Sequence, residues 1–175
     1  MWAEGRVGAV VMFSGQTWDG RPFILRPLAE GETRPDDSSE WDQWSGEFIS
    51  AHSEMHRAVI ECAGELVGSM SWHEEMYGPT VGSLCWNIGI GLVAVWRGKG
   101  IGAAAQRALA EHLFATTPHN RVEASTDVEN VAEQRALERA GFTREGILRG
   151  AQHRADDIHH DLVVYSVLRS ELELL

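Results

Sequence analysis

The chain has 175 residues, a length that fits one domain with a sizeable buried core. Hydrophobic residues make up 43% of it and charged residues 23%, ordinary proportions that exclude a disordered tail, a collagen-like repeat and a coiled coil. The 26 acidic and 15 basic residues give a formal net charge of −11. This balance argues against a nucleic-acid-binding or membrane-surface protein and leaves room for a cationic substrate.

The first half of the chain is expected to consist mainly of strands. Residues 1–21 are rich in glycine without a clear period and predict an irregular lead-in. A short helix is predicted to begin near Ser39, and Ala63-Gly64 has the form of a tight hairpin turn. The predicted strands of this half are Phe23–Leu28, His56–Cys62, Leu66–Met76 and Ser83–Val95.

The second half alternates helices with strands. Its first helix is predicted from apolar residues at helical spacing that start at Ile101, and Pro118 ends it. The elements that follow are strand Arg121–Thr126, helix Asn130–Ala140 with Gly141 after its end, and strands Phe142–Gly150 and Asp161–Leu168. Together these elements predict a single mixed α/β domain over residues 22–175, after the lead-in of residues 1–21.

The charges are unevenly placed along the chain. Lys99 is the only lysine, whereas seven acidic residues and one base, Arg34, lie between Glu30 and Glu47. The acidic stretch fits two interpretations: a solvated acidic face, or an acidic rim that concentrates amines at a nearby site.

The cysteines and the apolar runs bear on the compartment. Cys62 and Cys85 are too few for a disulfide scaffold, and neither belongs to a CxxC or Cys/His pattern, so we expect two buried thiols and no metal site. The apolar run of residues 7–13 lacks a preceding basic region and is too short to span a bilayer. We therefore expect a cytoplasmic protein without membrane attachment.

The glycine-rich turn between residues 97 and 102 is the most informative stretch. Gly98, Gly100 and Gly102 expose backbone amides between the end of a strand and the start of a helix, where the helix dipole is positive. Arg97 and Lys99 add positive charge at the same place. The turn therefore predicts an anion site suited to a pyrophosphate.

Two familiar phosphate loops fit this turn poorly. A Walker loop needs Ser or Thr after its Gly-Lys pair, and Gly100 follows Lys99 here. Residues 98–103 match the dinucleotide pattern G-x-G-x-x-A, with Glu123 at a plausible distance for a ribose contact. However, two residues separate the strand from the first glycine. The rest of the chain is also too short to complete a doubly wound sheet and a substrate domain.

The turn resembles the coenzyme A pyrophosphate loop of the GNAT acetyltransferases, through Arg97-x-x-Gly100-x-Gly102. Asn130, followed by the helix end Ala136–Phe142, is similar to the second motif of that family. The pattern Asn130-x-x-x-x-Arg135-x-Leu137-Glu138, with the closing strand Asp161–Tyr165, is most similar to the Rim type, whose members acetylate the N-terminal amines of ribosomal proteins. The resemblance implies a twisted, mostly antiparallel sheet with a central splayed parallel pair, flanked by helices.

By that resemblance, the chain transfers an acetyl group from acetyl-CoA to a primary amine by direct attack. The backbone of Val93 and Val95, together with Asn130, would contact the pantetheine arm. The pyrophosphate would be held by the turn, whose members are Arg97, Gly98, Lys99, Gly100, Ile101 and Gly102. The acceptor is a protein N-terminus or, alternatively, a small amine such as an antibiotic, a polyamine or a metabolite. A non-catalytic coenzyme A-binding module is the alternative from another class, and a homodimer is left open.

The residues for acid–base chemistry depart from the family pattern. Leu137 stands where many relatives have a tyrosine, and Asn87 where many have a glutamate; Glu133 and Gln152 also differ from the Rim type. Alternation on the strand 66–76 places His73 and Glu75 on its polar face, and Asn87 lies on the polar face of the next strand. We expect Glu75 or His73 to deprotonate the amine, directly or through a water on Asn87. The other interpretation is a solvent-exposed hairpin end.

Overall fold

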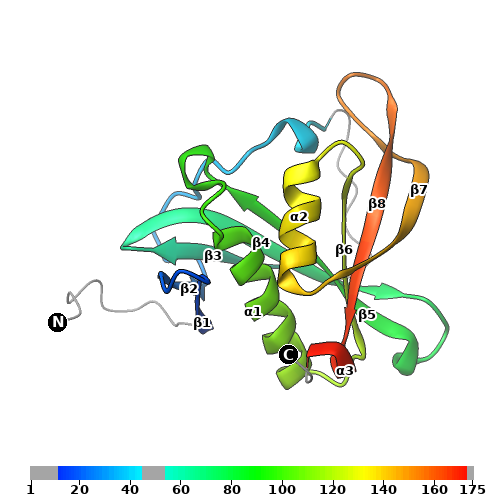
Figure 1. Cartoon of the computed structure of the whole chain (residues 1–175), viewed down its shortest axis with the longest axis horizontal. Coiled ribbons are helices and arrows are strands. Elements are labelled where there is room, and N and C mark those ends of the chain that lie inside the picture. The colour runs from blue at the N-terminus through cyan, green and yellow to red at the C-terminus, as the bar shows by residue number, and fades with distance from the viewer. Residues whose placement is uncertain (1–11, 45–53, 173–175) are drawn as a thin grey trace.

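The computed structural model describes residues 12–44 and 54–172. Eight strands form one sheet in the order β1-β2-β3-β4-β5-β6-β8-β7 (Figure 1). The elements are β1 Phe13–Gln16, β2 Pro22–Arg26, β3 His56–Cys62, β4 Glu65–Met76, β5 Leu84–Leu92, α1 Ile101–Thr116, β6 Arg121–Asp127, α2 Val131–Ala140, β7 Thr143–His153, β8 His159–Leu168 and α3 Arg169–Leu172. Three-residue 3₁₀ turns lie at Glu40–Asp42, Val81–Ser83 and Ala94–Trp96. The mixed α/β domain predicted from the sequence is confirmed.

The sheet is antiparallel except at its centre. β5 and β6 run parallel because the helix α1 connects them as a crossover. They pair over only two positions of the described sheet, Trp86 with Val122 and Asn87 with Glu123. Beyond Asn87, β5 stays paired with β4 as far as Leu92, whereas β6 stays paired with β8 as far as Asp127. The central parallel pair is therefore splayed, as expected.

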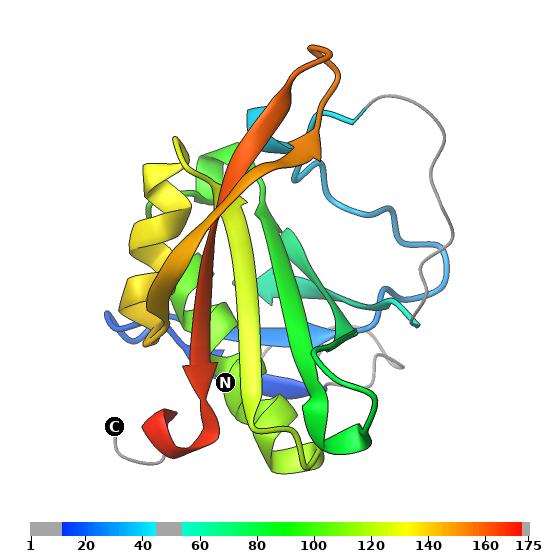
Figure 2. The ribbon, with the colours of Figure 1, turned by 90° about the vertical axis from the view of Figure 1, so that its right-hand side faces the viewer.

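One face of the sheet is covered by helices. Figure 2 shows α1 and α2 on one side of the sheet, while residues 27–44 run along the other side. α1 forms because its apolar residues recur on one face, and Ile101, Leu109 and Leu113 are almost completely buried. α2 ends at Gly141, whose φ of 97° is the left-handed conformation expected of a C-terminal glycine. The core thus lies between the sheet and these two helices.

The irregular lead-in predicted for residues 1–21 is wrong where the structure describes it. Residues 1–11 lie outside the described residues, but Phe13–Gln16 forms β1, which pairs with β2. Phe13 packs against the core and stacks on His112 of α1, with ring centroids 4.7 Å apart. Because this contact lies between distant residues, no local pattern indicates it. A domain boundary at residue 22 would divide a strand pair.

Two further elements differ from expectation. The strand predicted to reach Val95 ends at Leu92, because the chain then enters a 3₁₀ turn at Ala94–Trp96. The short helix predicted to begin near Ser39 is only the 3₁₀ turn Glu40–Asp42.

Candidate active site

The separation of β5 from β6 opens a cavity of about 660 Å³. Its walls are residues 88–92 of β5, residues 124–127 of β6, the first turns of α2 and the glycine turn. Asp37 and residues 39–41 close it from the side of the sheet opposite the helices, together with Gln152 and Arg154 at the end of the β7–β8 hairpin. All the segments that carried the family resemblance therefore meet at one cavity.

The glycine turn has the geometry of an anion site. Gly98 and Gly100 adopt φ values of 72° and 78°, which residues with a Cβ avoid. Gly100 is the N-cap of α1 and, having no side chain, does not itself cap the amides of the first helical turn. The first amides of a helix lack intrahelical partners and carry the positive end of the dipole. The turn lines the cavity and can accept a pyrophosphate on its backbone.

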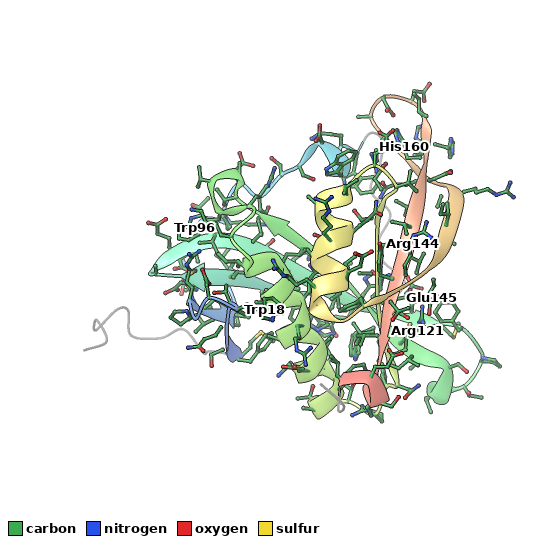
Figure 3. The ribbon with its side chains drawn as sticks, in the orientation of Figure 1. Trp18, Trp96, Arg121, Arg144, Glu145 and His160 are labelled. Carbon is green, nitrogen blue, oxygen red and sulfur yellow. The ribbon has the colours of Figure 1, made fainter. Side chains whose placement is uncertain are left out.

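The two cations of the turn have different surroundings. Arg97 donates from Nε to the carbonyl oxygen of Leu92 at 2.9 Å and from a terminal nitrogen to the carbonyl oxygen of Ser38 at 2.6 Å. Lys99 places its Nζ 4.5 Å from the ring centroid of Trp96, the tryptophan labelled in Figure 3. Lys99 can therefore turn toward a phosphate without breaking a hydrogen bond to the backbone, whereas Arg97 already bridges two segments.

The backbone of Val93, predicted to contact the pantetheine arm, is hydrogen-bonded within the protein. Its N–H donates to the carbonyl oxygen of Val67 at 2.9 Å, and its carbonyl oxygen accepts from the N–H of Trp96 at 2.8 Å. The N–H is therefore used within the protein, whereas the carbonyl oxygen keeps a second lone pair, and contact of Val93 with the pantetheine arm stays a prediction. Val95 is 71% exposed in the 3₁₀ turn rather than extended in a strand. The backbone that lines the cavity belongs to residues 88–92 instead.

Asn130 lines the cavity and also begins α2. Its Oδ1 accepts from the N–H of Glu133 at 3.2 Å, which is the geometry of an N-cap, and its Nδ2 donates to Oγ1 of Thr126 at 3.0 Å. A carboxamide has two lone pairs on its oxygen and two hydrogens on its nitrogen, so one of each remains for a ligand. Contact of Asn130 with the cofactor stays a prediction.

The three predicted catalytic residues are brought together. His73 and Asn87 lie directly opposite each other on β4 and β5, and His73 Nε2 lies 3.1 Å from Oε1 of Glu75. The side chains of His73 and Glu75 are 24% and 49% exposed. These three residues are not among those that line the cavity, but Ile88, which follows Asn87 in the sequence, does line it. The structure groups the three residues beside the cavity but does not test their catalytic role.

A buried carboxylate below the cavity was not predicted as part of the site. Glu123 is 5% exposed and accepts from Tyr77 Oη at 2.9 Å, from Asn87 Nδ2 at 3.3 Å and from Arg121. Figure 3 shows Arg121 beside Glu145, which also pairs with it. Burial, followed by the contact with Glu123, raises the pKa of Tyr77 to about 12. The alternation of Glu123 with the buried Val122 and Ala124 is the signal that could have identified this face of β6.

A second unpredicted feature is a buried ion pair at the other end of β6. Arg154 lies 2.7 Å from Asp127, and both side chains are at most 5% exposed. Asp127 also accepts from the N–H of Glu129 at 2.7 Å, and its carboxylate lies 3.4 Å from Nδ1 of His160. The pair therefore fixes the turn before α2 and holds the β7–β8 hairpin against the cavity. No sequence pattern indicates a pairing between residues this far apart.

The acidic stretch 30–47 is neither wholly a solvated face nor wholly a rim. Glu32 forms a bidentate contact with the buried Arg26, at 2.7 and 2.9 Å, and is therefore structural. Asp37 is 8% exposed and accepts a hydrogen bond from Ser69, and it lines the cavity together with Glu40. Part of the stretch thus borders the site, as the second interpretation expected.

Residues 12–44 and 54–172 contain neither a candidate metal site nor a candidate membrane-spanning helix. No group of three or more His, Cys, Asp or Glu side chains there could hold a metal ion. In the same ranges, no helix is both long enough and apolar enough to cross a membrane.

Comparison with known proteins defines the class. The family model of the acetyltransferase (GNAT) domain matches residues 16–143. The chain therefore belongs to the GNAT acetyltransferase family, as the two motifs at the cavity indicated.

The relatives include proteins of the Rim type. YdaF of Bacillus subtilis, whose name describes it as a ribosomal N-acetyltransferase, is 38% identical over 86 residues. That match covers 49% of this chain and 46% of YdaF, so the chain spans less than half the length of this curated relative.

Solved structures share the fold. RimJ of Mycobacterium smegmatis, in complex with CoA-disulfide, has a TM-score of 0.70 and 21% identity, covering 91% of this chain and 88% of RimJ. RimL, a ribosomal L7/L12 alpha-N-protein acetyltransferase solved in complex with coenzyme A, has a TM-score of 0.57 and 25% identity. The RimL match covers 65% of this chain and 62% of RimL. The resemblance of the chain to the Rim type is thus supported by YdaF and RimL.

Proposed function

We propose that the protein is an acetyl-CoA-dependent N-acetyltransferase that acts on a primary amine, with a protein N-terminal amine as the preferred acceptor. The observation that carries this proposal is the cavity between the splayed strands β5 and β6, which has the glycine turn at one end. Membership of the GNAT family supports the activity. The names of YdaF and RimL support the acceptor class.

In this proposal the glycine turn binds the pyrophosphate of acetyl-CoA. The amides that begin α1 supply the hydrogen bonds, and Lys99 supplies charge. The pantetheine arm lies in the gap beside residues 88–92, whose backbone has no strand partner toward β6 in the described sheet. The carbonyl oxygen of Val93, which accepts one hydrogen bond within the protein, keeps a second lone pair for the end of the arm.

The reaction is a direct attack of the neutral amine nitrogen on the thioester carbonyl carbon. A carbon–nitrogen bond forms, the carbonyl oxygen becomes an oxyanion, and the carbon–sulfur bond then breaks to release the thiolate of coenzyme A, which takes up a proton. Backbone N–H groups of β5 beyond Asn87 are the donors that we assign to the oxyanion. A general base must remove a proton from the amine, which is mostly protonated at neutral pH.

We assign proton removal to Glu75 or His73, acting directly or through a water held by Asn87. Two observations support this assignment: the hydrogen-bonding distance between His73 and Glu75, and the position of Asn87 directly opposite His73. Leu137 is completely buried in the core and has no ionisable group, so it contributes no proton to the leaving thiolate. We place the protein in the cytoplasm, in keeping with its two buried, free cysteines.

The proposal is tested by measuring release of coenzyme A thiol from acetyl-CoA with a panel of acceptors. The panel contains a peptide with a free N-terminal amine, the same peptide with a blocked N-terminus, spermidine and an aminoglycoside. We expect turnover of the free peptide with the highest kcat/KM and no turnover of the blocked peptide. Turnover of small amines alone would assign the protein to small-molecule acetylation. Binding of acetyl-CoA without thiol release for any amine would show a coenzyme A-binding module.

A further inference from the structure

Arg97 connects the cofactor end of the cavity to the wall formed by residues 34–41, here called the 34–41 segment. We propose that Arg97 is a positioning residue for the acceptor, because it holds this segment against the end of β5. The family motif alone would assign the arginine to the phosphate groups. The inference rests on the proposed function in that it takes the 34–41 segment as the acceptor side of the cavity.

The guanidinium of Arg97 binds two backbone carbonyls from distant parts of the chain. Leu92, at the end of β5, accepts from Nε at 2.9 Å, and Ser38 accepts from a terminal nitrogen at 2.6 Å. Arginine presents its donors in a fixed planar fork, so it can hold two carbonyls at once in a defined geometry. Lysine carries the same charge on one nitrogen and cannot reproduce this bridge.

The segment is prepared for this contact by a local turn. Ser38 donates from Oγ to Oδ1 of Asp36 at 2.7 Å, and the N–H of Asp37 donates to the carbonyl oxygen of Pro35 at 3.0 Å. The hydrogen bonds from Ser38 lower the pKa of Asp36, and the nearby charge of Arg97 lowers it further. The turn therefore fixes the chain on the N-terminal side of the carbonyl that Arg97 binds.

A second anchor holds the same segment one residue earlier. Asp37 packs on Gly91, where an added Cβ would lie 3.0 Å from its carboxyl group. Ser69 of β4 donates to Asp37 and accepts from Arg34 at 2.9 Å. Because Asp37 is held independently, loss of the Arg97 bridge would release the segment at Ser38 without detaching it from the sheet.

The residues that follow Ser38 form the wall of the cavity. Ser39, Glu40 and Trp41 all line it, together with Asp37. Arg97 belongs to the glycine turn at the cofactor end and contacts this segment through its bond to the carbonyl of Ser38 and its charge near Asp36. Its loss should therefore disturb the acceptor wall, while the backbone amides of the glycine turn stay in place.

The test compares two variants, Arg97→Lys and Lys99→Ala. Lys99 is the neighbouring cation, and in the described structure its ammonium group lies over the ring of Trp96 rather than on the 34–41 segment. Steady-state kinetics with acetyl-CoA and the best acceptor peptide give separate KM values for the two substrates. We expect Arg97→Lys to raise the acceptor KM about tenfold, since a charge-assisted hydrogen bond is lost, while kcat and the acetyl-CoA KM change less than about threefold. Lys99→Ala should instead raise the acetyl-CoA KM and leave the acceptor KM unchanged.

Hydrogen exchange supplies a readout that needs no activity. Amides of residues 36–44 should exchange faster in Arg97→Lys than in the wild type, whereas Lys99→Ala should match the wild type. An increase of the acetyl-CoA KM alone, or unchanged exchange in residues 36–44, would overturn the inference. If no amine is turned over, the proposed function fails, and the exchange result still decides whether Arg97 holds the segment.

Discussion

Asn87 and Glu123 are joined across the parallel strand pair at the centre of the sheet, where Nδ2 of Asn87 donates to Oε1 of Glu123 at 3.3 Å. They form the last residue pair before β5 and β6 separate, so this bond closes the bottom of the cavity. Glu123 also accepts from Tyr77 and Arg121, and it is almost completely buried. One carboxylate thus orders the amide predicted to hold a catalytic water.

Substitution Glu123→Ala should destabilise the protein and reduce its activity together. Three donors lose their acceptor, but Arg121 keeps Glu145 as a partner, so we expect a loss of about 1–3 kcal/mol in the free energy of unfolding, measured in urea. The control is Glu111→Ala, which removes an exposed helix pair with Arg107 and should change stability by less than about 0.5 kcal/mol. Equal effects of the two substitutions would contradict the role of Glu123.

Substitution Gly100→Ala should weaken binding of acetyl-CoA. The φ of 78° costs a residue with a Cβ roughly 1–2 kcal/mol, and the added methyl group would hinder the close approach of a phosphate to the amides of the turn. Gly64→Ala is a matched control, because Gly64 has a φ of 80° and, like Gly100, no atom within 4 Å of an added Cβ.

The two glycine variants should lose similar stability in urea unfolding. Calorimetry should show a Kd for acetyl-CoA raised at least about tenfold in Gly100→Ala and unchanged in Gly64→Ala. Unchanged affinity in Gly100→Ala would mean that the cofactor does not use this turn.

Substitution Glu75→Gln tests the assigned route of the proton. Loss of a general base lowers the rate about 10²–10⁴-fold, so we expect kcat to fall by at least about a hundredfold. The decline of kcat at low pH, where the base would become protonated, should disappear from the pH–rate profile. His73→Gln should act in the same direction if the imidazole works with Glu75.

The matched control for Glu75 is its neighbour on the opposite face of β4. Glu74 lies 2.8 Å from His119, away from Asn87, so Glu74→Gln should keep the pH–rate profile of the wild type. A Glu75→Gln enzyme with an unaltered profile would exclude Glu75 as the base. Asp37, a buried carboxylate on the cavity wall, would then be the next candidate for the general base.

The pair of Glu145 with Arg121 should make stability depend on pH in the acid range. Hydrogen bonds from Arg121 and then from Ser166 lower the pKa of Glu145 from its ordinary 4.5 to about 2. A lowered pKa in the folded state contributes stability above pH 4.5, and this contribution is lost as the pH falls from about 4.5 to about 2. Because the Glu145 side chain is 43% exposed, we expect its share to be no more than about 1 kcal/mol.

Urea unfolding at pH 6 and pH 3 measures that share. The loss of stability between these two pH values should be smaller in Glu145→Gln than in the wild type. Glu111→Gln, at an exposed position on α1, should show the full loss. A Glu145→Gln protein with the same pH dependence as the wild type would contradict the assignment.

Local patterns predicted the elements whose signals are local. The helix that starts at Ile101 follows from apolar spacing and an opening glycine turn, and the end of α2 follows from Gly141. Alternation assigned His73 and Asn87 to the polar faces of their strands, because side chains on a strand repeat every two residues, and the structure pairs these two residues. The family resemblance, rather than composition or spacing, supplied the splayed pair and the cofactor.

The features that were missed depend on distant partners. β1 is short and contains a glycine, and it is a strand because β2 pairs with it and Phe13 reaches α1. The contact of Asp127 with Arg154 and that of Arg97 with Ser38 join segments that are far apart in the sequence. The 3₁₀ turn after Leu92 likewise depends on a bond from Val93 to Val67 of β4. Such contacts are decided by the assembled sheet and have no periodic signature in the chain.

The two-residue join between β5 and β6 has a consequence for the order of folding. Hairpins such as β4–β5 and β7–β8 form between neighbouring segments of the chain. The parallel pairing of β5 with β6 is slower to form, because the helix α1 separates the two strands in the sequence. We therefore expect two halves of the sheet to form first and to dock last. The cofactor cavity exists only after docking, so a bound cofactor would stabilise the docked state by mass action. Acetyl-CoA would then stabilise the product of the final folding step in addition to being a substrate.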